Sequence, residues 1–414
     1  MNSPMHSIRP LDSMQKARLA VSALFLTNGA LFASMVPHYP EIKADLALGN
    51  GVYGLAVAAF PAGALAFGSA AAFLIRRFGS ARIAVAGTVT TAVMVFLVSI
   101  SPSLPSFALA LFFAGSSDVI TDVAQNAQGL QVQQRYHRSI INSFHAVWSA
   151  GVVIGGVSAS ISIALHIGRA MHLGLISALL IILALVASRF CIFDDQPSRD
   201  TRKQSRPESI RTLTSIPFHV YASLLGMAFI GVVACAVEDS GSSWASLYLS
   251  TSLNAPAAVA PLGYISLAAA QLVGRATGDR MVDAFGMRQV TRFGGALIAL
   301  GLGLALLFPS IPGTIAGFAA AGFGVSTLGP NSMAACDNLP YLRQGSGLTV
   351  VSWIMRAGFL LFPPLVGYIS DAVNLRTGLL VFPILGVLVV LAANVMPGTI
   401  RHDESFATNS DSSL

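Results

Sequence analysis

The sequence SDVITDVAQN (residues 117–126) is followed, after a short basic turn, by NSFHAVWS (residues 142–149), and each lies inside a long apolar segment. Asp118, Asp122 and Asn126 recur every four residues, so on a helix they lie on one face. In a segment that crosses a bilayer, each ionisable group costs about 2.5 to 3.5 kcal/mol at the helix centre and is a functional candidate by default. This stretch, the polar seam (residues 117–149), therefore predicts a functional site inside a membrane.

The second part of the polar seam repeats the pattern. Asn142, His145 and Ser149 are spaced by three and four residues, which again gives one helical face. We expect this face to meet the acids of the preceding segment, so that His145 lies opposite them. Histidine titrates near neutral pH, but a lone histidine can equally serve as a structural hydrogen-bond donor.

The composition is that of a membrane protein. Of 414 residues, 54% are hydrophobic and 10% are charged, with a mean hydropathy of +0.70, whereas soluble domains carry about 25% charged residues. The net charge of +6 does not indicate nucleic-acid binding, because the basic residues fall in short turns between apolar runs. The three cysteines are scattered without metal-ligand spacing, so we expect no metal site and no cofactor. We expect no signal peptide, because the first apolar run near Leu19 follows a basic leader and has no small-residue cleavage site behind it.

Twelve runs are long enough to span a bilayer. They lie near residues 19–37, 52–75, 83–100, 107–132, 140–164, 170–192, 216–238, 257–281, 290–308, 314–336, 347–370 and 377–396. We expect an all-α membrane protein with twelve transmembrane helices in two six-helix bundles related by a pseudo-two-fold axis. The predicted parts are an N-terminal segment (1–18), a first bundle (19–192), a linker (193–215), a second bundle (216–396) and a tail (397–414).

The distribution of basic residues predicts the orientation. Of the 24 Lys and Arg residues, only Lys43, Arg169 and Arg376 fall in turns on one side, and Arg356 lies within a span. The other side holds the rest, including both termini and the linker. By the positive-inside rule, both termini are cytoplasmic in a multi-pass protein of the bacterial inner (plasma) membrane.

The two halves repeat each other. Phe78-Gly79 and Phe285-Gly286 are 207 residues apart, as are Gly151 and Gly358. Parallel six-helix repeats are typical of one large class of secondary transporters, with the site at the repeat interface near the midplane.

With these motifs the chain resembles the major facilitator superfamily over essentially its whole length. The superfamily's signature after the eighth span is well kept: Gly274-Arg275, Gly278-Asp279-Arg280, Phe285-Gly286 and Arg288. After the second span only Arg76-Arg77-Phe78-Gly79 remains, with Arg76 where an acid is expected. The resemblance implies that Asp279, Arg280, Arg288 and Arg77 act in gating, by latching the cytoplasmic helix ends together when the carrier faces outward.

More narrowly, the chain resembles the rhizopine-permease-like and sugar-porter-like bacterial branch. The motifs are Asp122-Val123-Ala124-x-Asn126, Ser143-Phe144-His145-x-x-Trp148-Ser149-x-Gly151, Glu238 with Trp244, Gly263-Tyr264 and Pro363-Pro364-Leu365-Val366-Gly367. Gln133, Ser243 and Arg356 depart from the branch, the first two replacing acids and the third an aromatic residue. Because these departures fall near the expected cavity, the resemblance does not name a substrate.

The two aspartates of the polar seam are the candidates for proton coupling. Desolvation and a neighbouring like charge favour the protonated form of at least one carboxyl, which can then take up a proton on one side and release it on the other. We favour Asp122, because it lies in the recognised motif, with Asp118 as the alternative. Hydrogen bonds between membrane helices contribute only about 0.6 kcal/mol on average, so a purely structural polar cluster explains two buried carboxyls poorly.

The candidates for substrate binding surround these acids. They are Asn126, Asn142, His145, Trp148, Glu238 and Arg356. Trp148 suits stacking on a sugar-like ring, or it packs the core. Glu238-Asp239 ends the seventh span before a break predicted near Gly241, so it lines the cavity or forms an outer-surface acid pair. Arg356 needs an anion, which is Glu238, Asp337 or a substrate group.

These features predict a secondary active transporter and not an enzyme, since no nucleotide-binding loop or catalytic constellation occurs. We expect proton-coupled movement of a small polar solute (sugar-like, a polyol or a small organic acid). The alternatives are efflux of a toxic or signalling metabolite by proton antiport, and a transporter-like membrane sensor. Its partners are a small-molecule substrate, protons and the lipid bilayer, with no nucleic acid, and we expect a monomer.

Overall fold

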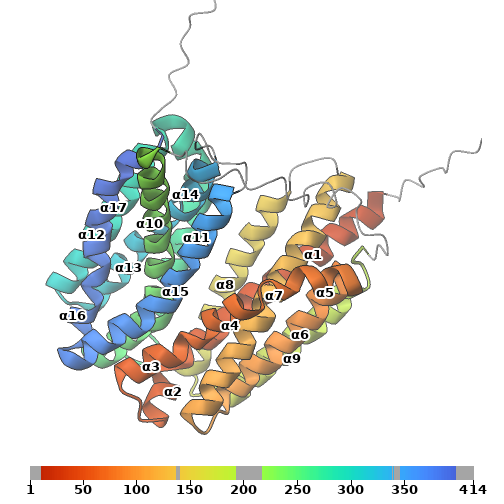
Figure 1. Ribbon diagram of the computed structural model, residues 1–414. Coiled ribbons are helices and arrows are strands. Elements are labelled where there is room, and N and C mark those ends of the chain that lie inside the picture. The colour runs from red at the N-terminus through yellow and green to blue at the C-terminus, as the bar shows by residue number, and fades with distance from the viewer. Residues whose placement is uncertain (1–10, 137–139, 193–216, 338, 340–345, 398–414) are drawn as a thin grey trace, which may run out of the picture.

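The computed structural model describes residues 11–136, 140–192, 217–337, 339 and 346–397, and these form helices packed in two bundles (Figure 1). The first bundle contains α1 (Leu11–Met35), η1 (Val36–His38), α2 (Tyr39–Asp45), α3 (Asn50–Val57), α4 (Ala59–Phe67), α5 (Ala70–Phe78), α6 (Ser80–Ser99), α7 (Leu104–Tyr136), α8 (Ile141–Ala164) and α9 (Arg169–Ser188).

The second bundle contains α10 (Phe218–Ser240), η4 (Gly241–Ala245), η5 (Tyr248–Ser252), α11 (Leu262–Phe285), α12 (Met287–Leu307), α13 (Ile311–Val325), α14 (Leu328–Asp337), α15 (Ser346–Ala372), α16 (Leu375–Leu379), α17 (Val381–Ala392) and η6 (Ala393–Val395). The predicted two-bundle architecture is confirmed. The predicted bundle boundaries stay a prediction, and the linker and most of both terminal segments lie outside the described residues.

Eleven helices of the described chain are long and apolar enough to cross a membrane. The predicted span at 257–281 is the exception, although it forms the regular helix α11 (Leu262–Phe285). Arg275, Asp279, Arg280 and Asp283 in its second half lower its hydropathy. The break predicted near Gly241 is also wrong: α10 continues directly into the π-helix η4, so the helix widens there instead of unwinding. Such π-helical turns are frequent at functional sites.

Close helix packing in the two bundles depends on the repeated glycines. A side chain on Gly151 of α8 would collide with the backbone carbonyl of Leu26 in α1. A side chain on Gly358 of α15 would lie 2.7 Å from the carbonyl oxygen of Val232 in α10. Each glycine therefore lets a pair of helices approach within backbone contact, and the same contact recurs in both halves.

The repeat also fixes the turns after the second and eighth spans. Gly79 joins α5 to α6 with φ 85° and ψ 148°, and Gly286 joins α11 to α12 with φ 79° and ψ 154°. These angles lie in the region that essentially only glycine adopts. The Phe-Gly pairs of the sequence are thus two copies of one backbone turn.

Two of the basic residues on the sparsely charged side of the molecule form equivalent caps. The Nε atom of Arg169 donates to the carbonyl of Ser99 at the end of α6 (2.9 Å), and the Nε atom of Arg376 donates to the carbonyl of Leu306 near the end of α12 (2.6 Å). Both the arginines and their acceptors are 207 residues apart. A cation at a helix C-terminus satisfies carbonyls that lack a helical partner, so these arginines have a structural role.

The two bundles contact one another at the end where α2, α3 and the C-terminal end of α15 lie, which we call the far side (Figure 1). The carboxylate of Asp371 on α15 accepts hydrogen bonds from the backbone nitrogens of Asn50 (2.8 Å) and Gly51 (2.7 Å) at the start of α3. Tyr53 donates to the carbonyl of Ser243 across the same boundary (2.8 Å). The opposite end, where α1 begins and α9 ends, is the terminal side.

The contact between bundles follows the repeat as well. Ser160 of α8 donates to the carbonyl of Ala258 (2.7 Å). The residues 207 positions away from these two are Gly367 and Gly51, and they pack together at the other copy of the interface. The far side is therefore closed by two related contacts.

We predict that Gly79→Ala lowers the free energy of unfolding by about 1 to 3 kcal/mol, because alanine is strained at this φ and ψ. Gly168→Ala is the matched control: neither position has an atom within 4 Å of an added side chain, and Gly168 has φ −56°. Alanine there should be neutral or slightly stabilising. Thermal unfolding in detergent measures both, and equal costs would contradict the backbone explanation.

Candidate functional site

The polar seam lies on α7 and α8, on the side of the first bundle that faces the second. Asp118 connects to α1, where the side-chain nitrogen of Asn28 donates to Oδ1 of Asp118 (2.8 Å). The indole nitrogen of Trp148 on α8 donates to the side-chain oxygen of Asn28 (2.7 Å). Asn28 therefore ties three helices together and supplies a hydrogen bond to the buried carboxyl.

Asp122 belongs to a second network one turn closer to the terminal side. The side-chain nitrogen of Asn126 donates to Oδ1 of Asp122 (3.0 Å), and Nε2 of His145 lies 3.1 Å from the side-chain oxygen of Asn126. An amide oxygen only accepts, so Nε2 carries the hydrogen in this arrangement. The predicted proximity of His145 to the acids is thus realised through Asn126.

Arg356 approaches the polar seam from the opposite bundle. Its guanidinium is exposed, and its Nη1 lies 3.5 Å from the place where a side chain on Gly68 would begin. The charge of Arg356 acts on Asp122 across the space between the bundles. Among the described side chains, Arg356 forms no ion pair with an acid. Its guanidinium is therefore accessible to an anion in the space between the bundles.

Glu238, one of the three anions considered for Arg356, lies 3.7 Å from Arg275. Arg275 comes from α11 and also lies over the Trp148 ring, 6.0 Å from its centroid, which joins the two bundles by a cation–π contact. Arg275 on α11 and Glu238 on α10 are neighbours within the second bundle. Arg356 on α15 belongs to the same bundle, but its charge acts on Asp122 of the first bundle. The side chains of Asp337 and Asn142 lie outside the described residues.

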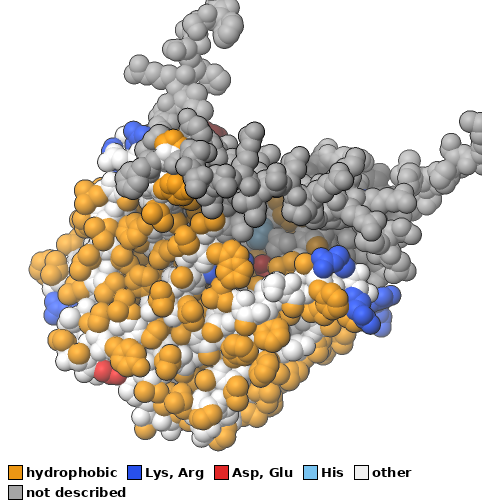
Figure 2. All heavy atoms as spheres, viewed as in Figure 1, with side chains coloured by type: hydrophobic (Ala, Val, Ile, Leu, Met, Phe, Trp, Pro, Cys, Tyr) orange, Lys and Arg blue, Asp and Glu red, His pale blue; other side chains and the backbone are white. Residues whose placement is uncertain are grey.

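Figure 2 shows basic, acidic and histidine side chains gathered in a hollow between the two bundles, on a face that is otherwise largely hydrophobic. His145, Arg275 and Arg356 are exposed, while Asp118, Asp122 and Trp148 are half-buried. Water therefore reaches the polar seam, although its residues lie at the middle of long apolar helices. The site is a polar cavity lined by both bundles.

The predicted gating residues lie on the terminal side. Asp279 and Arg280 are exposed and form no ion pair within the described part of the chain. Arg288 donates to the carbonyl of Met396 (3.0 Å), and Arg77 lies over the ring of Phe78 (5.6 Å). The predicted latch concerns the state in which the terminal side is closed, so it stays a prediction.

Three residues of this region were missed by the sequence reasoning. Asn28 is one amide in the first span, and only its contact with Asp118 marks it. Arg275 appeared as part of the loop signature, and its position one residue after Gly274 gave no sign that it enters the cavity. Asp239 was considered only together with Glu238, as lining the cavity or as part of an outer-surface acid pair, and it is buried.

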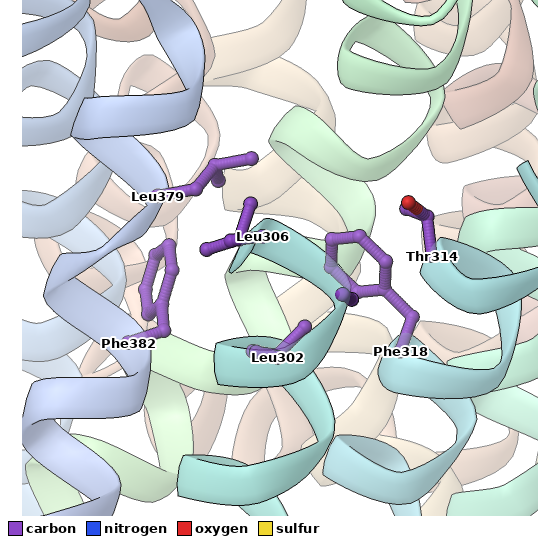
Figure 3. A pocket seen from close by; sticks show the side chains of 7 residues that line it. Leu302, Leu306, Thr314, Phe318, Leu379 and Phe382 are labelled. Carbon is purple, nitrogen blue, oxygen red and sulfur yellow. The ribbon is translucent and has the colours of Figure 1, made fainter. Parts of the chain in front are cut away.

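Other sites are few in the described residues. No group of three or more His, Cys, Asp or Glu side chains there could hold a metal ion. Figure 3 shows a small pocket inside the second bundle whose lining is apolar except for one threonine. Its residues are Leu302, Ala305, Leu306, Thr314, Phe318, Leu379 and Phe382. The chemistry therefore concentrates in the cavity between the bundles.

Two helical bundles around a polar cavity, with apolar outer faces, define a multi-pass membrane transporter for a small molecule. The model of the Major Facilitator Superfamily matches residues 20–274, and the chain belongs to this family. It is a secondary transporter and not an enzyme, as its family and its relatives are transporters.

The relatives cover nearly the whole chain. Membrane protein MosC of Rhizobium meliloti is 27% identical over 392 residues, which is 94% of this chain and 92% of that protein. An uncharacterized MFS-type transporter of Yersinia pestis is 27% identical over 383 residues, with 91% and 94% covered. These matches indicate a bacterial membrane.

Solved structures share the fold. The crystal structure of the nucleoside transporter NupG matches with a TM-score of 0.71 at 13% identity, covering 92% of this chain and 98% of that one. A bacterial homologue of the human lysosomal transporter Spinster, in an inward-facing and occupied conformation, matches with a TM-score of 0.69 at 14% identity, covering 91% and 95%.

We predict that Asn28→Ala lowers the free energy of unfolding by about 1 to 3 kcal/mol, because it leaves the Trp148 nitrogen and the Asp118 carboxyl without a partner. Asn394→Ala removes an exposed amide and should change it by less than about 0.5 kcal/mol. Thermal unfolding in detergent compares the two. Equal effects would show that Asn28 does not bridge these helices.

Proposed function

We propose that this protein is a proton-coupled secondary active transporter that moves a small polar solute across the bacterial inner membrane by alternating access. The solute is sugar-like, a polyol or a small organic acid. The distribution of basic residues supports cytoplasmic termini, and the cavity lies within one chain, which supports a working monomer.

The observation that carries the proposal is the placement of Asp122. Its carboxyl is half-buried, accepts a hydrogen bond from Asn126, and feels the charges of His145 and Arg356 from two other helices. A carboxyl in such a site exchanges a proton with a water-filled cavity, and its charge depends on whether a cation faces it. Asp118 is hydrogen-bonded by Asn28, whereas His145 and Arg356 act on Asp122, so we favour Asp122 as the coupling residue.

The cavity offers complementary groups to a polar solute. Arg356 supplies an exposed guanidinium, and Asn126 and His145 supply hydrogen bonds on the facing bundle. Trp148 presents a ring that Arg275 already covers on one side. Hydroxyl groups and a carboxylate suit these partners, because guanidinium groups pair with carboxylates through two parallel hydrogen bonds.

Alternating access is supported by the asymmetry of the contacts between bundles. The far side is closed by Asp371, Tyr53 and Ser160, whereas Asp279 and Arg280 on the terminal side are exposed. In the alternate state, we expect the far-side contacts to open and the terminal-side loop to close. The solute would then be released on the other side of the membrane.

We predict that Asp122→Asn abolishes accumulation of solute in proteoliposomes carrying a pH gradient, while exchange without a gradient continues. The reason is that asparagine keeps the hydrogen bond but cannot carry a proton. The assay first screens radiolabelled sugars, polyols and organic acids with the wild type, inward and outward. Asp118→Asn is the matched control and should retain accumulation. If Asp122→Asn concentrates solute as well as the wild type does, the assignment is wrong.

We predict that Arg356→Gln weakens binding of anionic solutes by about ten- to a hundredfold, the equivalent of a charge-assisted hydrogen bond. Neutral solutes should be affected much less. Competition of unlabelled acids and polyols with the transported solute measures both. Equal losses would favour the alternative in which Arg356 closes a gate by an ion pair.

A further inference from the structure

Asp239 is a carboxyl buried inside the far-side contact. Its residue is only 7% exposed, at the end of α10 where the π-helix η4 begins. Ser243 donates its hydroxyl to Oδ1 of Asp239 (3.0 Å), but Oδ2 is buried and has no hydrogen-bond partner in the described part of the chain. One of its two oxygens is therefore unsatisfied.

The contact that buries Asp239 comes from the opposite bundle. The carbonyl of Ser243 accepts the hydrogen bond from Tyr53, and the Tyr53 ring packs edge-on against Trp244, with centroids 5.3 Å apart. Tyr39 packs behind Tyr53 at 6.4 Å. All three aromatic side chains are almost fully buried. Separation of Tyr53 from Ser243 would therefore expose Asp239 to water on the far side.

No cation balances the charge of Asp239 in the described structure. The titratable groups that interact with it are Tyr39 of α2, Tyr53 of α3, and Cys235 and Glu238 of α10. Tyr264 of α11 and Arg356 of α15 interact with these neighbours. The tyrosines and the thiol are neutral when buried, Glu238 carries a like charge, and Glu238 already engages Arg275. Arg356 forms no ion pair with Asp239.

An ionised carboxylate without a partner is far more costly to bury than a neutral one. The effective penalty for a buried ion is several times that of an unsatisfied neutral group, even after relaxation of the surroundings. The closed far side therefore favours the carboxylic acid, in which a proton removes the charge. Once the contact opens, water hydrates the group and the carboxylate becomes the stable form.

We call the far-side contacts between the bundles, which include the hydrogen bond of Tyr53 to Ser243, the far-side gate. We propose that Asp239 is a proton-binding site of this gate. Its carboxylate takes up one proton from the far-side solution as the gate closes and releases it as the gate opens. The step forms one O–H bond on the carboxylate and needs no other reactant. It uses a carboxyl distinct from those of the polar seam. The inference rests on the alternating-access part of the proposed function, because the gate must open.

The test measures the gate directly, without substrate. Spin labels on cysteines at Ala44 and Val373, both exposed at the far side, report its opening by pulsed electron resonance in nanodiscs, with the native cysteines replaced by alanine. Because the open state binds one proton fewer, the ratio of open to closed gate should rise with pH, by up to about tenfold per unit. Measurements from about pH 5 to pH 9 cover the range in which buried carboxyls titrate.

Asp239→Asn should remove this pH dependence and keep the gate mostly closed, since asparagine is neutral at every pH. Asp283→Asn, an exposed acid on the terminal side, should retain it. Asp122→Asn is measured beside them to separate a contribution of the cavity carboxyl. Tyr53→Phe loses the hydrogen bond to Ser243, so it should raise the open fraction about two- to tenfold at every pH without changing the slope.

An unchanged pH dependence in Asp239→Asn overturns the proposal and leaves alternating access intact. Loss of the dependence in Asp122→Asn but not in Asp239→Asn assigns the proton to the cavity and also overturns it. A gate that opens at no pH, even in Tyr53→Phe, rejects both this inference and alternating access. These three results are distinguishable within one set of samples.

Discussion

A carboxylate cannot remain charged and unpartnered in the interior of a membrane protein, because neither lipid nor apolar side chains solvate it. This constraint explains why each acid of the cavity is tied to an amide, a hydroxyl or an arginine. Asp118 depends on Asn28, Asp122 on Asn126, and Glu238 on Arg275. The partners come from different helices, so meeting this constraint also sets how the helices are placed around the cavity.

The two acids of the polar seam lie one turn apart on α7 but differ in the groups that surround them. Asn28 and Trp148 enclose Asp118 from α1 and α8. Asp122 lies where His145 and Arg356 converge from both bundles. Two like carboxyls one helical turn apart thus have different surroundings, because different helices face them, and this difference is why we propose Asp122 as the exchangeable group.

Much of the fold could be predicted from the sequence. Long apolar runs indicate membrane helices by length alone, and the 207-residue offset of Phe78-Gly79 and Phe285-Gly286 reflects a real backbone turn. The pairing across the cavity could not be predicted, because it depends on helix rotation and tilt. Glu238 was one of three candidate anions for Arg356, beside Asp337 and a substrate group, and it lies 3.7 Å from Arg275 instead. The burial of Asp239 could not be predicted for the same reason: the sequence places it at a helix end, and the packing of other helices around that end buries it.

The joint between Asp371 and the start of α3 has a consequence for how the two bundles can vary over evolution. Asp371 binds the backbone nitrogens of Asn50 and Gly51, and the side chain of Asn50 interacts with it as well. A side chain on Gly51 would lie 2.8 Å from the ring of Tyr368 and 3.0 Å from Oδ2 of Asp371, so this position is restricted. At position 50 almost any residue preserves the backbone donor, and only proline removes it. The carboxylate has no such tolerance. Sequence change is therefore tolerated unevenly across this contact: position 50 can vary while its backbone donor is kept, whereas Asp371 and Gly51 cannot be replaced without losing the contact or its close packing.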